Sequence, residues 1–381
     1  MCFIARQTPD EKGILRIEAR IQELIRAIGD RKIDWGALTV KWNPKAIEKA
    51  VVLKRYVSDH EPGVVLISFE YQWTRLMGMA NLAEFARRYT LVVATSSTPP
   101  HALGTTLFMH QYPGERVFAL LSNPADVKTL PRLSPKIRAV PLYASNWIDP
   151  DLYHPLPFPE KDIDIAMIAG FGRVKRHFAL FRALRKMPRD VRVVMVGQPM
   201  GMTAADILAM AGQYGVRDRI KLVESVPFEE VGRWLARAKI SLVLSRREGS
   251  STVVMESMFA DTPVGIYEDA RIGSRVFINE QTGRFLRHED LGKQLLDFLA
   301  NAGRYSARER ALRDRLCCHG STAVLNRELK ESALAEGKAW TEDIAVHRWT
   351  PDPQLLPAHR ERLNEAYQDL RQRFGVTLGT Q

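Results

Sequence analysis

The chain has 381 residues, enough for two or three domains of roughly 100 to 200 residues each. Apolar residues make up 45% and charged residues 26%, a globular composition that excludes a disordered or fibrous protein. A net charge of +11 favours anionic partners: nucleotides, nucleic acid or an anionic membrane surface. The cysteines, Cys2, Cys317 and Cys318, fit neither a disulfide framework nor a zinc site, so we expect a reducing cytoplasm.

The N-terminal region predicts no membrane span and no signal peptide, because no apolar run approaches roughly 18 residues. Residues 14–28 instead place isoleucines and a leucine at helical spacing, with Arg and Glu on the other face. This amphipathic helix has two open interpretations. It packs on the protein core, or it makes peripheral contact with an anionic membrane at the inner face.

The first part of the chain alternates β-rich and helical stretches. Apolar runs at 64–69, 91–95, 117–122 and 138–143 predict strands, and 74–88 predicts a helix. Strand, helix, strand is typical of parallel βαβ units, so we expect a Rossmann-like, acceptor-side domain over residues 1–147. The Pro-rich stretch 148–162 is interpreted as a linker.

The second part repeats the alternation more clearly. Strands are predicted at 163–170, 191–197, 220–223, 240–245 and 263–267, with an amphipathic helical stretch between each pair. Near-continuous apolar strands indicate a sheet covered on both faces, and hence a doubly wound α/β domain over 163–335 with its ligand crevice at the carboxyl ends of the strands. Residues 336–381 are predicted to form a helical tail.

The most informative stretch is 241–267. A buried strand ends at Ser245, and a helix is expected to begin near Ser250 or Ser251, either of which can act as the N-cap. The N–H groups at a helix start attract an anion, and Gly249 allows it to approach. Glu248 and Glu256 can then hold sugar hydroxyls. The alternative is that Glu248 caps the helix and Glu256 is a solvated residue.

The run from Glu248-Gly249 through Glu256 to Thr262-Pro263-Val264 resembles the Glu-Gly and Gly-Thr-Pro-Val signature of glycosyltransferase family 4. The resemblance extends over most of 138–300 and includes the turn at Thr282-Gly283. It implies the GT-B fold, in which two Rossmann-like domains face each other across a cleft. It also implies transfer of a sugar, with retention of configuration, from a nucleotide-diphosphate sugar to a glycan, lipid-linked or small-molecule acceptor.

The resemblance also implies roles for individual residues. Glu248 would face the donor sugar and Glu256 would bind the ribose hydroxyls, while backbone groups of Gly249, Ser250 and Ser251 would bind the diphosphate. Cations that stabilise the leaving diphosphate would come from the loop 169–177, in which the candidates are Gly172, Arg173, Lys175 and Arg176. An exposed basic loop is the alternative for this segment.

No histidine, cysteine or aspartate pattern suggests a metal site, so we expect a metal-independent hexosyltransferase of this type. No cofactor is expected besides the nucleotide-diphosphate sugar as co-substrate. Arg and Lys would then supply the positive charge that Mg²⁺ supplies in other enzymes.

The N-terminal domain lacks the Gly-rich loop that family members often carry, since none occurs in residues 1–40. The resemblance suggests a histidine after a strand, for which His101 is the first candidate and His110 the second. A loop histidine without function is the alternative for each.

Three other functions compete with this interpretation. A nucleic-acid-binding protein is disfavoured, because basic residues are interleaved with acidic ones and no known motif occurs. A nucleotide-sugar epimerase on the same fold stays possible. A catalytically inactive GT-B scaffold that binds a nucleotide or a protein partner is the main alternative, motivated by the short N-terminal domain.

Overall fold

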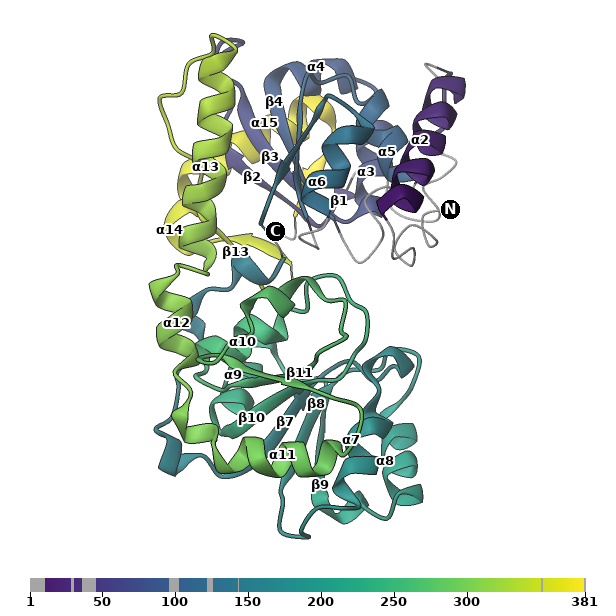
Figure 1. Ribbon diagram of the computed structural model, residues 1–381. Helices are drawn as coiled ribbons and strands as arrows, with labels where there is room; N and C mark the ends of the chain where they lie inside the picture. Colours follow the sequence, from purple (N-terminus) through teal and green to yellow (C-terminus); the bar gives the residue numbers. More distant parts are fainter. Residues whose placement is uncertain are drawn as a thin grey trace. The chain divides into compact units, whose positions relative to one another are not determined.

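The computed structural model describes residues 11–28, 31–35, 46–95, 103–121, 126–142, 144–350 and 352–379. The chain forms two compact units (Figure 1). The first unit combines Met1–Trp147 with Cys318–Gln381, and the second comprises Ile148–Cys317. The second unit therefore ends earlier than residue 335, and the segment interpreted as a linker belongs to it.

The first unit is built on a five-stranded sheet in the order β2-β3-β4-β5-β6. Its strands are β2 (Ala50–Lys54), β3 (Gly63–Ser68), β4 (Tyr89–Ala94), β5 (Val117–Leu120) and β6 (Ile137–Val140). Strand β2 pairs antiparallel with β3, and the other pairs are parallel. The apolar runs form strands because every residue of β2, β3 and β5 is buried.

Helices connect these strands. They are α3 (Glu70–Met77), α4 (Leu82–Arg88), α5 (Leu103–Gln111) and α6 (Asp126–Leu133). Gly78 ends α3, so the single helix predicted over 74–88 is two helices. The amphipathic helix α2 (Glu11–Ile28) contacts α5 and α6, with Ile21 and Ile25 buried. Its apolar face is therefore packed against protein, as the first of the two interpretations predicted.

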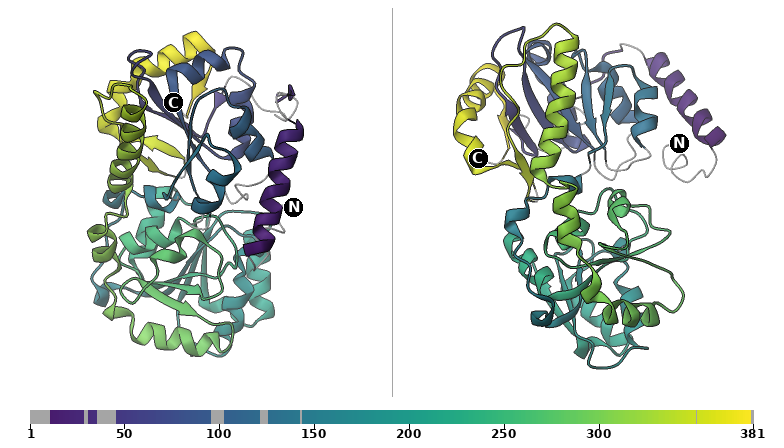
Figure 2. Two further views of the ribbon diagram at one scale, coloured as in Figure 1. Left: turned by 45° about the horizontal axis from the view of Figure 1, so that its top comes forward. Right: turned by 60° about the vertical axis from the view of Figure 1, so that its left-hand side comes forward.

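The C-terminal segment completes the first unit. It contains α13 (Cys318–Ala335), β13 (His347–Trp349), β14 (Pro353–Leu355), α14 (Pro357–Arg360), α15 (Asn364–Phe374) and β15 (Thr377–Leu378). Figure 2 shows α13 running along the sheet of this unit. Arg138 of β6 binds Glu328 of α13, and β15 pairs with β1 (Ala46–Ile47). These contacts explain why the C-terminal segment joins the first unit although it follows the second in sequence.

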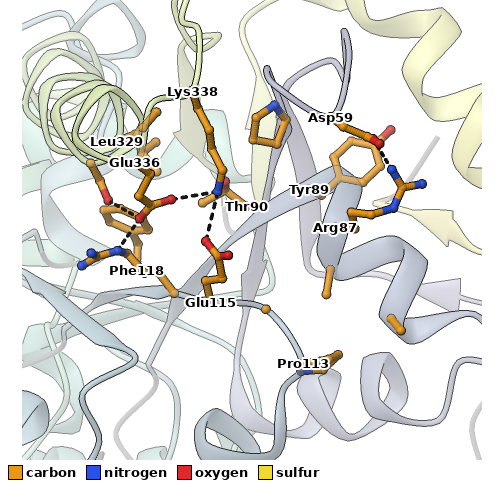
Figure 3. Close-up of a pocket in the computed structure, with 17 residues that line it drawn as sticks. Asp59, Arg87, Tyr89, Thr90, Pro113, Glu115, Phe118, Leu329, Glu336 and Lys338 are labelled. Atoms are coloured by element: carbon orange, nitrogen blue, oxygen red, sulfur yellow. Dashed lines mark hydrogen bonds and ion pairs between the residues drawn. The ribbon is translucent and has the colours of Figure 1, made fainter.

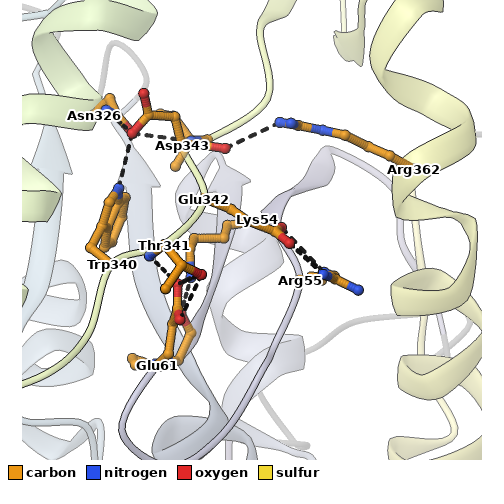
Figure 4. A network of polar contacts seen from close by, with 11 residues as sticks. Lys54, Arg55, Glu61, Asn326, Trp340, Thr341, Glu342, Asp343 and Arg362 are labelled. Carbon is orange, nitrogen blue, oxygen red and sulfur yellow. Dashed lines mark hydrogen bonds and ion pairs between the residues drawn. The ribbon is translucent and has the colours of Figure 1, made fainter.

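A buried ion pair ties the C-terminal segment to β2 (Figure 4). Lys54 and Glu61, both almost fully buried, lie 2.8 Å apart, and the backbone and hydroxyl of Thr341 donate hydrogen bonds to Glu61. The Trp340 ring lies 5.0 Å from the Lys54 ammonium. Burial raises the pKa of Glu61, but hydrogen bonds from Lys54 and Thr341 outweigh it and lower the pKa to about 2.

The second unit contains a six-stranded parallel sheet in the order β12-β11-β10-β7-β8-β9. The strands are β7 (Ile163–Ile168), β8 (Val193–Gly197), β9 (Ile220–Glu224), β10 (Ala238–Val243), β11 (Val264–Tyr267) and β12 (Gly283–Leu286). The chain passes from β7 outward to β9, then returns to the other side of β7 with β10. The strand order therefore reverses between β7 and β10, as in a doubly wound fold.

Helices cover both faces of this second sheet. They are α7 (His177–Leu184), α8 (Ala204–Gln213), α9 (Phe228–Ala236), α10 (Val253–Phe259), α11 (Leu291–Ala300) and α12 (Ala307–Arg313). Figure 1 shows α7, α8 and α11 on one side, with α9 and α10 on the other. Right-handed crossovers produce this division, because the direction of winding changes at β10.

All five strands predicted for the second unit are present within three residues of the expected bounds. Among the described residues six further strands were missed: β2, the short strand β1, β12, which was interpreted only as a turn, and β13, β14 and β15, which lie in the tail predicted to be helical. Strand β12 is a four-residue edge strand that carries Arg284, so its pattern is weak. Among the described residues, the structure contains no helix that is both long and apolar enough to cross a membrane.

Candidate functional site

The candidate site lies at the carboxyl ends of β7 and β10, the neighbouring strands at which the strand order reverses. Two loops meet there. One follows β7 and contains residues 169–176, and the other follows β10 and contains residues 244–252. Ligands of doubly wound sheets bind at such a position, because the loops on either side diverge and leave room between them.

Lys175 and Glu248 join the two loops. The Lys175 Nζ atom lies 2.7 Å from the Glu248 Oε1 atom, with side chains 20% and 14% exposed. Together with Ser251 they line a cavity of about 10 Å³, roughly the volume that one water molecule needs. The structure thus brings together two residues that are 73 positions apart and that the sequence analysis placed in one crevice.

The two arginines of the same loop have different surroundings. Arg173 is exposed. The Arg176 guanidinium lies 5.3 Å from the centre of the Phe178 ring and 5.6 Å from that of Tyr267, and its Nε atom is buried. Of the three candidate cations, Lys175 is therefore the one that contacts the candidate carboxylate.

Gly172 allows two loops to pack closely. A Cβ atom at this position would lie 2.7 Å from the Met200 Cε atom and 2.8 Å from the Met200 carbonyl oxygen. Met200 belongs to the loop after β8, and its backbone N–H donates to the Phe171 carbonyl. A glycine is thus required here by a close approach of backbone.

The loop after β10 is pinned to the segment after β11. The Glu248 N–H donates to the Arg271 carbonyl, and the Gly249 carbonyl accepts from the Gly273 N–H at 2.6 Å. Helix α10 begins at Val253 with Thr252 in the capping position, rather than at Ser250 or Ser251. Ser251 has a φ of 40°, which is incompatible with a right-handed helix. The prediction that Ser250 or Ser251 caps the helix is therefore wrong.

Glu256 is 5% exposed, which contradicts the alternative that it is a solvated helical residue. Burial raises the pKa of its carboxyl to about 7, although a hydrogen bond from the Thr252 side chain acts in the opposite direction. The Tyr153 phenol is also buried, and burial together with the charge of Glu256 raises its pKa well above the ordinary value. The two candidate glutamates therefore differ, since Glu248 faces a cation while burial dominates around Glu256.

Two residues near the site were missed by the sequence analysis. Tyr153 lies in the segment interpreted as a linker, and His177 is the first residue of α7. His177 is 3% exposed, and burial together with the neighbouring Lys175 lowers its pKa to about 4. Its position directly after the basic loop was the available signal. His101 lies outside the described residues, and the backbone carbonyl of His110 accepts a hydrogen bond from Lys136.

A larger cavity, of about 380 Å³, lies in the first unit (Figure 3). It is at the amino ends of β4 and β5, between α4 and the end of α13, and the candidate residues named from the sequence do not line it. Its charged side chains are paired: Lys338 binds Glu336 at 2.8 Å and Glu115 at 3.3 Å, and Arg87 binds Asp59. The crevice of the second unit therefore remains the candidate site.

Residues 151–313, which lie within the second unit, match the family model of glycosyl transferases group 1. A D-inositol 3-phosphate glycosyltransferase from Xylanimonas cellulosilytica is 33% identical over 107 residues, which are 27% of this chain and 26% of that protein. The match thus spans about a quarter of the relative's length.

Solved structures resemble a larger part of the chain. Sucrose-phosphate synthase from Thermosynechococcus elongatus has a TM-score of 0.56 at 16% identity, covering 72% of this chain and 74% of that one. HepE from Anabaena, in complex with UDP, has a TM-score of 0.55 at 14% identity, covering 73% and 79%. The chain therefore has the GT-B fold expected from its sequence, and residues 151–313 of its second unit match glycosyl transferases group 1.

Proposed function

We propose that the chain is a retaining glycosyltransferase of family 4 that transfers a hexosyl group from a nucleotide-diphosphate sugar to a glycan, lipid-linked or small-molecule acceptor. The observation that carries the proposal is the Lys175–Glu248 pair at the point where the strand order reverses. It lies within the stretch that matches glycosyl transferases group 1. An ammonium suits a diphosphate, and a carboxylate accepts hydrogen bonds from sugar hydroxyls.

In this proposal the loop after β7 binds the leaving group. Lys175 contacts the diphosphate, Arg173 or Arg176 adds a second positive charge, and Gly172 lets the loop approach. Negative charge grows on the diphosphate as the glycosidic bond breaks, so these cations stabilise the transition state more than the ground state. They supply the charge that a divalent ion supplies elsewhere, and we therefore propose transfer without a metal.

The loop after β10 positions the rest of the donor. Backbone N–H groups of Gly249, Ser250 and Ser251 bind the diphosphate, and Glu248 orients the sugar. Glu256 binds the ribose hydroxyls. The acceptor attacks on the face from which the diphosphate departs, so the configuration at the transferring carbon is retained. His101 stays a prediction for the acceptor side.

The test is the thermal stability of the purified protein with UDP, GDP, ADP and their common sugar conjugates, each with and without EDTA. UDP comes first because HepE was solved with it. A ligand at 100 times its Kd adds about 2.7 kcal/mol to the stability. We expect one nucleotide to raise the Tm irrespective of EDTA. If no nucleotide does so, the proposal is wrong and the chain is a GT-B scaffold that binds a protein partner.

A further inference from the structure

The Lys175–Glu248 ion pair engages two groups that the proposed reaction needs for the donor. The Lys175 ammonium is directed at Glu248 at 2.7 Å, and the Oε1 atom of Glu248 accepts that hydrogen bond. Both side chains are largely withdrawn from solvent, so water competes weakly for the pair. While the pair is intact, neither charge is directed at a donor.

The cavity beside the ion pair is small. The cavity lined by Lys175, Glu248 and Ser251 has a volume of about 10 Å³, which suffices for one water molecule. A sugar ring is several times larger than a water molecule. This cavity therefore holds no donor sugar while the two side chains are paired.

Each loop carries a residue in a strained backbone conformation beside the pair. Arg176, directly after Lys175, has a φ of 58°, and Ser251, three residues after Glu248, has a φ of 40°. Residues other than glycine adopt this left-handed region at an energetic cost, and such strain persists where the surrounding structure holds it. Both loops are thus held in arrangements that the local sequence does not favour.

We propose that the Lys175–Glu248 pair is a latch that the donor diphosphate opens. The diphosphate takes the Lys175 ammonium from Glu248, and the released carboxylate becomes available to the sugar that the same donor carries. The order is fixed by chemistry: a neutral sugar offers Lys175 no anion in exchange for Glu248, whereas a diphosphate does. This inference rests on the proposed function for the identity of the anion.

The test uses inorganic pyrophosphate as the probe, with affinities measured by calorimetry on the full chain. In Glu248→Gln the ammonium no longer has to break an ion pair before it binds the anion, so we expect the Kd for pyrophosphate to fall about 3- to 10-fold, the size typical of an ordinary hydrogen bond. Glu248→Asp keeps the charge but is one methylene too short for the pair. It should also tighten binding, which a general loss of negative charge would not explain.

The chain offers a matched control on the same two strands. Lys239 of β10 and Asp164 of β7 form an ion pair of 2.7 Å with similar exposure, 29% and 14%, at the opposite ends of these strands. Asp164→Asn removes one negative charge from the unit without touching the loops. Its Kd for pyrophosphate should match that of the native protein.

The double variant Lys175→Met/Glu248→Gln decides between the latch and simple electrostatics. The latch requires that Glu248→Gln no longer increase the affinity for pyrophosphate when Lys175 is absent. A gain that persists in the Lys175→Met background overturns the latch, as does pyrophosphate binding that is unchanged in both Glu248 variants. The proposed function fails separately, when no nucleotide raises the Tm and no sugar is transferred.

Discussion

The Thr252 side chain donates a hydrogen bond to the Glu256 carboxyl one turn further along the chain, yet the pKa of that carboxyl is about 7. Burial outweighs the hydrogen bond, because Glu256 is 5% exposed and the charged form loses its hydration. Helix α10, which directly follows one loop of the candidate site, thus contains a carboxyl that changes charge near neutral pH.

This carboxyl makes the stability of the fold depend on pH. Its pKa rises from 4.5 in the unfolded chain to about 7, so the folded state keeps the proton between these values while the unfolded state releases it. The contribution of Glu256 to the free energy of unfolding is fully present below pH 4.5 and is lost as the pH rises through 7. The full loss is about 3 kcal/mol at roughly 1.4 kcal/mol per pH unit.

Glu256→Gln cannot ionise and should escape this loss. We expect the variant to equal the native protein in urea unfolding at pH 4.5 and to exceed it at pH 8.5, by up to about 3 kcal/mol. If the free energy of unfolding depends on pH in the same way in the two proteins, Glu256 is not the group that causes the loss of stability.

Substitution of the two candidate glutamates should separate catalysis from binding. Glu248→Ala removes a group placed at the sugar and should lower kcat by about 100-fold or more, as loss of a transition-state contact does. Glu256→Ala should raise the nucleotide Kd about 10-fold through lost hydrogen bonds to the ribose. Steady-state kinetics and nucleotide calorimetry measure the two effects.

The matched control for both is Glu229→Ala on the exposed side of α9, which should change neither value. If both substitutions leave kcat and the nucleotide Kd unchanged, the proposed site is wrong.

The buried Lys54–Glu61 pair should fasten the C-terminal segment to β2. Lys54→Met leaves the Glu61 carboxylate buried without its cation, and we expect a loss of about 3 to 5 kcal/mol in the free energy of unfolding. The neighbouring Arg55–Glu342 pair is largely exposed, so Arg55→Ala should cost much less.

The same pair predicts a sensitivity to acid. The folded pKa of Glu61, about 2, lies below the ordinary 4.5, so its contribution is present above pH 4.5 and declines as the pH falls toward 2. In Glu61→Gln this part of the acid dependence should disappear. Chemical unfolding between pH 3 and 6 provides the comparison, and an unchanged slope would exclude Glu61 as its source.

Gly172 should tolerate no side chain, whereas Gly212 should. Gly172→Ala forces a methyl group against the Met200 carbonyl and should destabilise the protein by about 1 to 3 kcal/mol through overpacking. Gly212 lies inside α8 with nothing within 4 Å of its absent Cβ, so alanine there should stabilise by about 1 kcal/mol. Thermal unfolding of the two variants tests the contrast, and a Gly172→Ala protein as stable as the native one would refute the packing argument.

Local pattern was sufficient for much of the second unit. The apolar runs at 163–170 and 240–245 are β7 and β10, because a strand buried on both faces needs a run of apolar residues that is visible in the sequence. The polar residues that follow these runs could be assigned to one crevice, since parallel strands place their carboxyl ends at one edge. The outcome for Lys175 and Glu248 agrees with that assignment.

Other features had no local signal. Strand β12 has four residues at a sheet edge, and α13 joins the first unit only through contacts with residues far away in sequence. Whether Lys175, Arg173 or Arg176 would meet Glu248 depended on how the loop after β7 bends, and Arg176 turns among aromatic rings.

By itself, the sequence determined the α/β class, the strands of the second unit and the edge of the sheet that carries the charged loops. These follow from periodicity within a few residues, because burial selects apolar side chains position by position. Only the tertiary structure decided which cation pairs with Glu248 and that Glu256 is buried. Such contacts join segments tens of residues apart, and they depend on the strand order and on loop conformations that local residue patterns do not encode.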